Sequence, residues 1–398
     1  MDFRDIFTPG APPQKHELLV GREVELNKLR SFLKSPGIHP IVVGARGVGK
    51  TSLVQEVINE FELSSQIEAN TVKNFNELAR HLCDDSAVSD QLISQSVEQH
   101  EQSMDAKADV VVASGGLSSK RTFSEYIKGL GDENISPQQL LRLLEGAKSR
   151  IIFSIDELDD LPSESDITYN LAKFAKSVSN QSKRINHKFV FSGIGRGAHD
   201  LFSGHLSSNR NFPIIYLNPI NTVHLREFIK YSTGSLGVNV PSEISDEVVT
   251  DSNGFPYYVH QIFFHMFEVH EESGDAEIRY EHYIEAKKRA FDSAFSHQLN
   301  KYKFTIYRLN NVQKEILQNM VSGRKVHFEY ASLEKGILSH HDIGKVKKAF
   351  RFLTDNEYIS YRKSDKSVSL VEPLLKPFLR SKLKLSGNHV QPGLWDQN

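Results

Sequence analysis

The stretch Gly44-Ala45-Arg46-Gly47-Val48-Gly49-Lys50-Thr51 matches the pattern G-x-x-x-x-G-K-[ST]. The apolar run Ile41-Val42-Val43 before it predicts a buried strand, and residues 52–58 after it predict the first turns of a helix. Glycines let backbone N–H groups surround a phosphate group without clashes from Cβ atoms, and the N-terminus of a helix adds positive potential. The pattern therefore predicts a phosphate-binding loop.

Two residues of this loop have side chains suited to a nucleotide. We expect Lys50 to reach the β- and γ-phosphates, and we expect the Thr51 hydroxyl to bind Mg²⁺. The residues expected to contact the phosphates are Arg46, Gly47, Val48, Gly49, Lys50, Thr51 and Ser52.

A second apolar stretch, residues 150–155, predicts another buried strand and ends in Asp156 and Glu157. A buried strand that ends in two carboxylates is typical of a Walker B element. Asp156 is expected to hold the Mg²⁺ shell, and Glu157 is expected to orient and deprotonate the attacking water. Asp159 and Asp160, which follow, are interpreted as a solvated acidic turn.

Composition narrows the class of protein. The 398 residues are enough for two or three domains, and 39% hydrophobic and 25% charged residues are ordinary for a globular chain. A formal net charge of -2 is too small for the protein as a whole to attract nucleic acid or membranes electrostatically. The single cysteine, Cys83, excludes an intrachain disulfide, and we interpret it as a core residue in a reducing compartment. No apolar stretch has the length of a membrane span and no signal peptide is present, so we expect a cytoplasmic protein without a membrane partner.

Strands alternate with helices up to residue 217, which predicts an α/β fold with a parallel sheet and helices on both faces. Further strands are expected at 67–72, 188–192 and 213–217. From residue 221 onward the pattern becomes helical, and Thr222 is expected to cap the first of these helices. The expected divisions are an N-terminal arm (1–17), a nucleotide-binding domain (18–220) with an insertion (84–135), an all-α lid (221–303), a winged-helix domain (304–384) and a tail (385–398).

The winged-helix expectation rests on three helices at 311–321, 330–336 and 343–355, followed by a hairpin of strands 358–362 and 367–371. Apolar residues of the third helix are expected to face the core, which turns its basic residues outward. A basic recognition helix is typical of double-stranded DNA binding, whereas the alternative is the solvated face of a protein-interaction domain. The candidate DNA-binding residues are Lys345, Lys347, Lys348 and Arg351 on the helix and Lys363 on the wing.

The order of these motifs resembles the AAA+/STAND P-loop ATPases, nearest to the initiator clade of origin-recognition and helicase-loader ATPases and their bacterial and archaeal relatives. The resemblance covers residues 7–384, except 84–135, and implies ATP or ADP as ligand with Mg²⁺. Val20 and Gly21, in Val20-Gly21-Arg22-Glu23, resemble the family's opening motif, whose backbone touches adenine. Pro256, in Gly254-Phe255-Pro256, resembles the STAND proline that packs against the base or ribose.

The same resemblance suggests further catalytic residues. Arg210 precedes the last strand, where the family carries an arginine finger that acts on the γ-phosphate of a neighbouring subunit; this implies a homo-oligomer, and the alternative is a solvated loop arginine. The sensor-1 role falls on Ser192 or on Arg196. The family's lid arginine is absent from 257–261, which reads Tyr-Tyr-Val-His-Gln, so hydrolysis is expected to be slow or switch-like.

These observations leave three functional hypotheses. The first is an ATP-hydrolysing protein whose assembly on DNA or with a protein partner depends on the bound nucleotide. The second is an ADP-held signalling switch of a defence or regulatory system, in which the winged helix contacts protein rather than DNA. The third is a nucleotide-binding scaffold without hydrolysis, against which the intact Glu157 argues.

Overall fold

The computed structural model describes residues 2–11, 19–84, 136–145, 150–161, 166–181, 187–194, 210–297, 302, 305–322, 327–362, 366–371 and 375–383. Nearly all of the predicted insertion and the predicted tail lie outside these ranges. The chain forms two compact units, one of residues 12–218 and the other of residues 1–11 together with 219–398.

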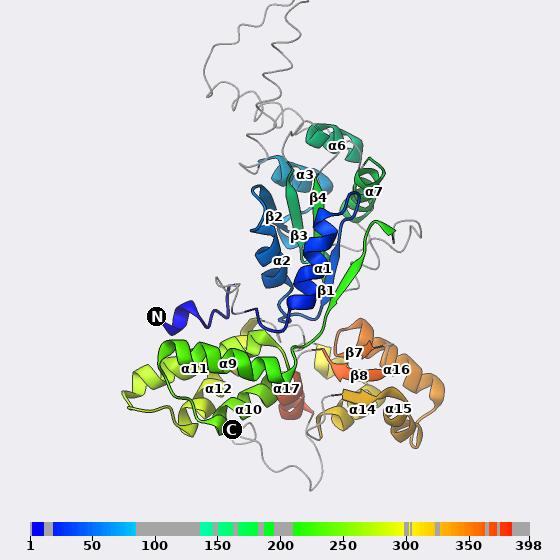
Figure 1. Cartoon of the computed structure of the whole chain (residues 1–398). Coiled ribbons are helices and arrows are strands. Elements are labelled where there is room, and N and C mark those ends of the chain that lie inside the picture. The colour runs from blue at the N-terminus through cyan, green and yellow to red at the C-terminus, as the bar shows by residue number, and fades with distance from the viewer. Residues whose placement is uncertain are drawn as a thin grey trace, which may run out of the picture. The chain divides into compact units, whose positions relative to one another are not determined.

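A five-stranded sheet organises the unit of residues 12–218 (Figure 1). Its strands follow the order β2-β3-β4-β1-β5, and every neighbouring pair is parallel. This confirms the predicted α/β fold with a parallel sheet. The strands are β1 (Ile41–Gly44), β2 (Ser64–Glu68), β3 (Ile152–Asp156), β4 (Lys188–Gly193) and β5 (Ile214–Leu217).

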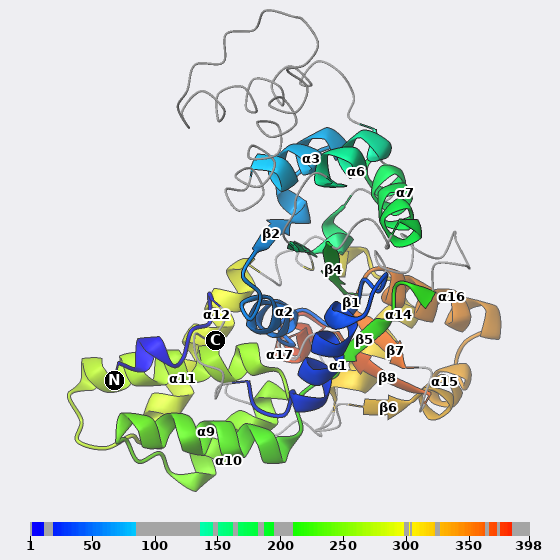
Figure 2. The ribbon, with the colours of Figure 1, turned by 45° about the horizontal axis from the view of Figure 1, so that its top comes forward.

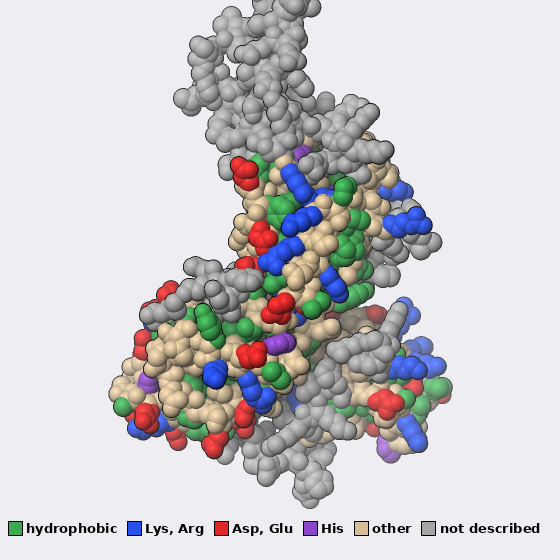
Figure 3. All heavy atoms as spheres, in the orientation of Figure 1, with side chains coloured by type: hydrophobic (Ala, Val, Ile, Leu, Met, Phe, Trp, Pro, Cys, Tyr) green, Lys and Arg blue, Asp and Glu red, His purple; other side chains and the backbone are tan. Residues whose placement is uncertain are grey.

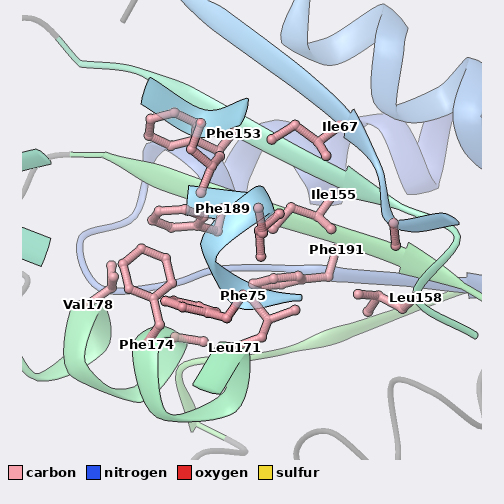
Figure 4. Packing of buried hydrophobic residues seen from close by; sticks show 14 of the residues in the cluster. Ile67, Phe75, Phe153, Ile155, Leu158, Leu171, Phe174, Val178, Phe189 and Phe191 are labelled. Atoms are coloured by element: carbon pink, nitrogen blue, oxygen red, sulfur yellow. The ribbon is translucent and has the colours of Figure 1, made fainter. Parts of the chain in front are cut away.

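The central strands β1, β3 and β4 are buried along their whole length because helices cover both faces of the sheet. Phe153 of β3 stacks on Phe189 of β4 with ring centroids 5.0 Å apart, and Phe174 meets Phe189 edge-on at 5.2 Å (Figure 4). The helices that contribute to this cluster are α3 (Phe75–Asp84), α6 (Pro137–Glu145) and α7 (Asp166–Asn180). Helix α2 (Lys50–Ile58) contacts β1, β3 and β4 with residues outside this cluster, and α1 (Glu23–Lys34) packs beside α2.

Strand β2 does not have the predicted bounds. The expected strand at 67–72 begins instead at Ser64 and ends at Glu68, and Ala69–Thr71 form the 3-10 helix η3. The register explains the difference, because Ser64 pairs with Ile152 and Glu68 pairs with Asp156. Pairing with β3 therefore sets the bounds of β2, and the local β-propensity of residues 69–72 does not.

Residues 222–297 form four helices, which we call the helical segment. Asn221, not the predicted Thr222, caps the first of them: its side chain accepts a hydrogen bond from the backbone N–H of Val223 at 2.9 Å. Asparagine at this position already has extended backbone geometry, so the helix begins at Thr222 itself, one residue earlier than a cap at Thr222 would place it. The helices are α9 (Thr222–Leu236), α10 (Ser242–Ser252), α11 (Pro256–Ser273) and α12 (Tyr280–His297).

The predicted N-terminal arm is not a free loop. Residues 3–5 form the 3-10 helix η1 (Phe3–Asp5), and this part of the chain belongs to the same compact unit as the helical segment. Phe3 stacks on Phe267 with centroids 5.4 Å apart, and Phe7 stacks on Phe263 at 4.9 Å. Sequence reasoning missed this because nothing local distinguishes two phenylalanines that pack from two that do not.

The C-terminal segment, residues 305–383, contains the three predicted helices and the predicted hairpin. A short strand joins the hairpin to give a three-stranded antiparallel sheet of order β6-β8-β7 (Figure 2). The last helix was not predicted. The elements are η6 (Ile306–Arg308), α14 (Asn311–Val321), β6 (His327–Glu329), α15 (Tyr330–Leu338), α16 (Ile343–Asp355), β7 (Ile359–Arg362), β8 (Ser367–Leu370) and α17 (Leu375–Lys382).

Among the helices of the described ranges, none combines the length and the hydropathy that a membrane span requires.

Candidate functional site

The predicted phosphate-binding loop connects β1 to α2 in the unit of residues 12–218. Gly47 and Gly49 have φ angles of 78° and 96°, a region that residues with a Cβ rarely adopt. Gly44 is required for another reason, since a Cβ there would lie 2.8 Å from the carbonyl oxygen of Leu217. Helix α2 begins at Lys50, and no side chain caps its N-terminus. Its first backbone N–H groups are therefore available to an anion.

Lys50 lies half-buried at the start of α2, and its Nζ donates a hydrogen bond to the carbonyl oxygen of Ala45 at 3.2 Å. Burial lowers the pKa of Lys50, and the nearby carboxylates of Asp156 and Asp159 oppose that shift. The ammonium group of Lys50 therefore lies against the phosphate-binding loop. From this position its charge can act on an anion bound at the start of the helix. Arg46 and Ser52, which we expected beside it, are half-buried.

The Asp156 carboxylate joins three parts of the site. Its Oδ2 accepts the hydroxyl proton of Thr51 at 2.6 Å, and its Oδ1 accepts that of Ser192 at 2.5 Å. The backbone N–H of Glu157 donates to the same Oδ1 at 2.8 Å. Asp156 is only 3% exposed, so these three bonds satisfy a buried carboxylate. The structure therefore brings together the predicted residues of the loop, the end of β3 and the end of β4.

The structure describes only one of the two residues that the sequence offers for the sensor position. Ser192 is fully buried at the end of β4, bonded to Asp156. Arg196 lies outside the described residues. Among the described residues, the polar side chain at this point is therefore that of Ser192.

Glu157 occupies an unusual backbone conformation. Its φ and ψ are 58° and 42°, in the left-handed region, and it precedes the 3-10 helix η4 (Leu158–Asp160). A non-glycine residue in this region costs of order 1–3 kcal/mol and is typical of functional sites. The conformation turns the chain sharply at the end of β3, directly after the residue that contacts Thr51.

Asp159 corrects an expectation. It was interpreted as part of a solvated acidic turn, but its Oδ2 accepts the backbone N–H of Ile194. A Cβ at Gly193 would collide with the same carboxylate, so this close approach requires glycine there. Asp159 therefore ties the turn after β3 to the end of β4, and it contributes to the negative potential around Lys50.

Arg22 is a further residue that sequence reasoning did not assign, because the resemblance drew attention to the backbone of Val20 and Gly21. Arg22 is 4% exposed, and its Nη2 donates to the carbonyl oxygen of Val48 at 2.8 Å. Burial lowers its pKa, and Glu25 at 3.8 Å opposes this shift. Gly21 has a φ of 68°, which directs the chain into α1. The buried guanidinium of Arg22 thus supports the phosphate-binding loop at Val48.

The remaining predicted residues come from other parts of the chain. Arg210 is exposed just before β5. Pro256 is the first residue of α11, in the other compact unit. Lys345, Lys347, Lys348 and Arg351 are exposed on α16, while Val346, Phe350 and Leu353 are buried. Figure 3 shows basic side chains gathered over the part of the surface where Figure 1 labels α16. Lys363 lies outside the described residues.

Comparisons with known proteins agree with this geometry. Residues 18–181 match the model of the AAA ATPase domain family. Among solved structures, the Walker-type ATPase PABY2304 of Pyrococcus abyssi is similar with a TM-score of 0.62 at 17% identity, covering 94% of this chain and 99% of that one. The ORC2 protein of Aeropyrum pernix, solved as ADPNP-ADP complexes, has a TM-score of 0.54 at 11% identity, covering 96% and 99%.

At these identities the structural likeness shows the fold alone. No curated protein matches the sequence. The family match covers the phosphate loop, β3 and Glu157, whereas Ser192, the third partner of Asp156, lies beyond the matched residues. Residues 18–181 are thus similar to an AAA ATPase domain, and the site supports ATP binding by an ATPase.

Proposed function

We propose that this chain is an AAA+ protein that binds ATP with Mg²⁺ and hydrolyses it slowly. The observation that carries the proposal is the Asp156 carboxylate, which is bonded at once to Thr51 of the loop and to Ser192 at the end of β4. A phosphate loop used only as a turn has no need of such a carboxylate at its helix N-terminus. In a nucleotide site, the same carboxylate orients the metal-binding hydroxyl and the end of the neighbouring strand.

The donor set fits Mg²⁺. This ion prefers oxygen ligands and is usually bound by one or two protein groups, with waters and phosphate oxygens completing its shell. Thr51 and Asp156 provide a hydroxyl and a carboxylate only 2.6 Å apart. These two residues would hold Mg²⁺, which when bound would neutralise charge on the β- and γ-phosphates.

The chain's own groups account for the other requirements. Lys50 and the N–H groups at the start of α2 bind the phosphates. Glu157 orients a water and removes its proton, and its left-handed backbone directs the turn in which it lies. Val20 and Gly21 contact the base through their backbone.

The test of this function separates binding from hydrolysis. Lys50→Ala should lose ATP binding in titration calorimetry, whereas Lys34→Ala, an exposed lysine at the end of α1, should bind as wild type does. Glu157→Gln should bind ATP and release no phosphate above background. Unchanged ATP affinity in Lys50→Ala would overturn the assignment of the loop.

We further propose that the C-terminal segment is a winged-helix domain that binds double-stranded DNA. Three lysines lie in the first two turns of α16, where the helix dipole disfavours positive charge. This arrangement lowers the stability of the helix, and a bound polyanion would offset that effect. Lys348→Ala should weaken binding to a DNA duplex and reduce its salt dependence, measured by fluorescence anisotropy. Lys335→Ala on α15 is the control, and equal affinity in both variants would contradict the proposal.

The alternative, an ADP-held switch, has one supporting observation. Tyr258, Val259, His260 and Gln261 are buried in the helical segment, at the positions where the resemblance expects a lid arginine. A lid without that cation distinguishes ATP from ADP less well. ADP that stays bound through purification would favour the switch, whereas a nucleotide-free preparation that turns over ATP would exclude it.

A further inference from the structure

A helical turn near the start of the chain carries three apolar side chains on one side. In residues 3–7, which we call the arm turn, the backbone N–H groups of Ile6 and Phe7 donate to the carbonyl oxygen of Phe3 at 3.1 Å and 2.8 Å. Side chains at positions i, i+3 and i+4 of such a turn lie on the same side, and these positions hold Phe3, Ile6 and Phe7. All three are buried, so the arm turn is docked through this side.

The surface that receives these side chains, which we call the arm-binding face, belongs to α9 and α11. Phe7 is stacked on Phe263 at 4.9 Å and lies edge-on to Phe228 at 6.0 Å. Phe3 is stacked on Phe267 with ring centroids 5.4 Å apart. The arm turn and both helices belong to the same compact unit. The residues of the arm-binding face are Phe228, His260, Phe263, Phe264, Phe267 and Glu271.

Two polar contacts fix the direction and the register of the arm turn on this face. The backbone N–H of Thr8 donates to Nδ1 of His260 at 3.1 Å. Burial lowers the pKa of His260 to about 4, so its ring is neutral at pH 7 and this nitrogen can accept. At the exposed edge, Nη2 of Arg4 donates to Oε2 of Glu271 at 2.7 Å. Apolar side chains at i, i+3 and i+4 are also the pattern by which protein surfaces recognise short helical segments of their partners.

The arm turn is stabilised by its own residues. Asp2 caps it by accepting the backbone N–H of Arg4 at 2.9 Å, and the Arg4 guanidinium lies over the Phe3 ring, 4.2 Å from its centroid. A short segment with these local contacts can form the same turn without being continuous with the rest of the chain. Burial of the three apolar side chains favours docking, whereas the entropy lost in ordering a chain terminus opposes it. Because these two terms oppose each other, docking is reversible.

We propose that the arm-binding face is a recognition site for a short helical turn of a partner protein, and that the chain's own arm turn is its tethered occupant. The partner segment that fits has large apolar side chains at the first, fourth and fifth positions of the turn and a basic residue at the second. Without the arm turn, the face would expose the rings of Phe228, Phe263 and Phe267, and large apolar patches mark interaction sites. The partner segment and the arm turn use the same side chains, so each excludes the other.

The binding test uses the full chain and a fluorescein-labelled peptide of residues 1–11, measured by fluorescence anisotropy. The double variant Phe3→Ser with Phe7→Ser, which we call the open variant, should bind this peptide. Wild type should bind it roughly tenfold more weakly if the arm turn occupies the face in about nine molecules of ten, because the apparent affinity scales with the fraction of competent molecules. Val248→Ala on α10 removes buried apolar atoms from the same helical segment and keeps the arm turn, so it should bind as weakly as wild type.

Charge reversal tests the register. The open variant should prefer the wild-type peptide to an Arg4→Glu peptide, and the open variant with Glu271→Arg should show the opposite preference. Each preference should be roughly twofold to fivefold, the size of an exposed ion pair. A Phe7→Ser peptide should bind neither chain. Equal binding of all three peptides would overturn the recognition site, because the face would then attract any apolar peptide.

A last measurement needs no variant of the chain. Hydrogen exchange of residues 3–8 in wild type should become faster when excess peptide is added, since the peptide displaces the arm turn; a peptide made with heavier isotopes is distinguished by its mass. The Phe7→Ser peptide should leave the exchange unchanged. Unchanged exchange with the wild-type peptide would overturn the proposal, also where the open variant fails to fold. A dimer in sedimentation that excess peptide dissociates would show that a second copy supplies the turn, and would overturn the tethered arrangement.

Discussion

Glu157 combines an expected catalytic role with a backbone conformation that a side chain disfavours, and small substitutions separate the two. Its φ of 58° lies in the left-handed region, where a Cβ costs about 1–2 kcal/mol. Glycine avoids this cost but loses about 0.4–1 kcal/mol more conformational entropy on folding than alanine does. Glu157→Gly should therefore be more stable than Glu157→Ala by roughly 0.5–1 kcal/mol, the reverse of the order at an ordinary position.

The comparison is made by urea unfolding of the full chain, on the transition of the unit of residues 12–218. Both variants lose the same side-chain interactions, so their difference isolates the backbone effect. Glu357, with a φ of 57° in the C-terminal segment, is the matched control, and its glycine variant should likewise exceed its alanine variant. An alanine variant at 157 at least as stable as the glycine variant would refute the left-handed assignment.

Turnover distinguishes the two glutamates. Glu157→Gly, Glu157→Ala and Glu157→Gln should each lower the rate of ATP hydrolysis by roughly 10²–10⁴, the usual contribution of a general base. The variants at Glu357 should keep the wild-type rate. If Glu157→Gln released phosphate as fast as wild type, the strained conformation at 157 would need an explanation other than catalysis.

Three further predictions concern other residues. Arg22→Met should lower ATP affinity roughly tenfold, because the loop carbonyl that Arg22 contacts loses a buried charged donor; calorimetry with unchanged affinity would show that the loop holds its shape alone. Burial lowers the pKa from 6.5 to about 3 for His39 and to about 4 for His260, so between those values and 6.5 the folded state binds fewer protons than the unfolded chain. Stability should therefore fall as pH drops below about 6.5, by about 3 kcal/mol for His260 near pH 4; asparagine at each position should flatten the pH dependence of unfolding in its own unit, and unchanged slopes would contradict the burial argument. If Arg210 acts on a neighbouring subunit, turnover per chain should rise with protein concentration, Arg210→Ala should lose that rise, and mixing it with Glu157→Gln should restore part of the activity; concentration-independent turnover without rescue would leave Arg210 an ordinary loop residue.

Local pattern was sufficient wherever the structure depends on neighbours in sequence. The phosphate loop and the helix after it follow from glycines, a lysine and a threonine within eight residues, although α2 begins at Lys50, two residues before the predicted start at Ser52. The capping box of α14 and the apolar face of α16 likewise depend on residues that are close in sequence. Those two helices have the predicted bounds. Periodicity and turn chemistry act over a few residues, so the sequence displays them directly.

Tertiary structure alone decided which distant residues meet. Asp156 and Ser192 are bonded because β3 and β4 pair in parallel, with Ile155 opposite Phe191 in the register. The same pairing brings Asp159 to Ile194, which a sequence pattern presents only as an acidic turn. Ser192 is one of two sensor candidates in the sequence, and only the pairing of β3 with β4 shows its contact with Asp156.

The clearest failures of sequence reasoning were the N-terminal arm and Arg22. Phe3 and Phe7 sit among prolines and glycines that predict a loop, yet they are buried against helices far along the chain. Arg22 belongs to an exposed-looking charged run, yet it is buried under the phosphate loop. Burial depends on which surfaces the whole fold brings together, and a short stretch of sequence carries no local sign of a partner farther along the chain. The amino-acid sequence by itself determined the chemistry of the phosphate loop, and the assembled fold decided what supports it.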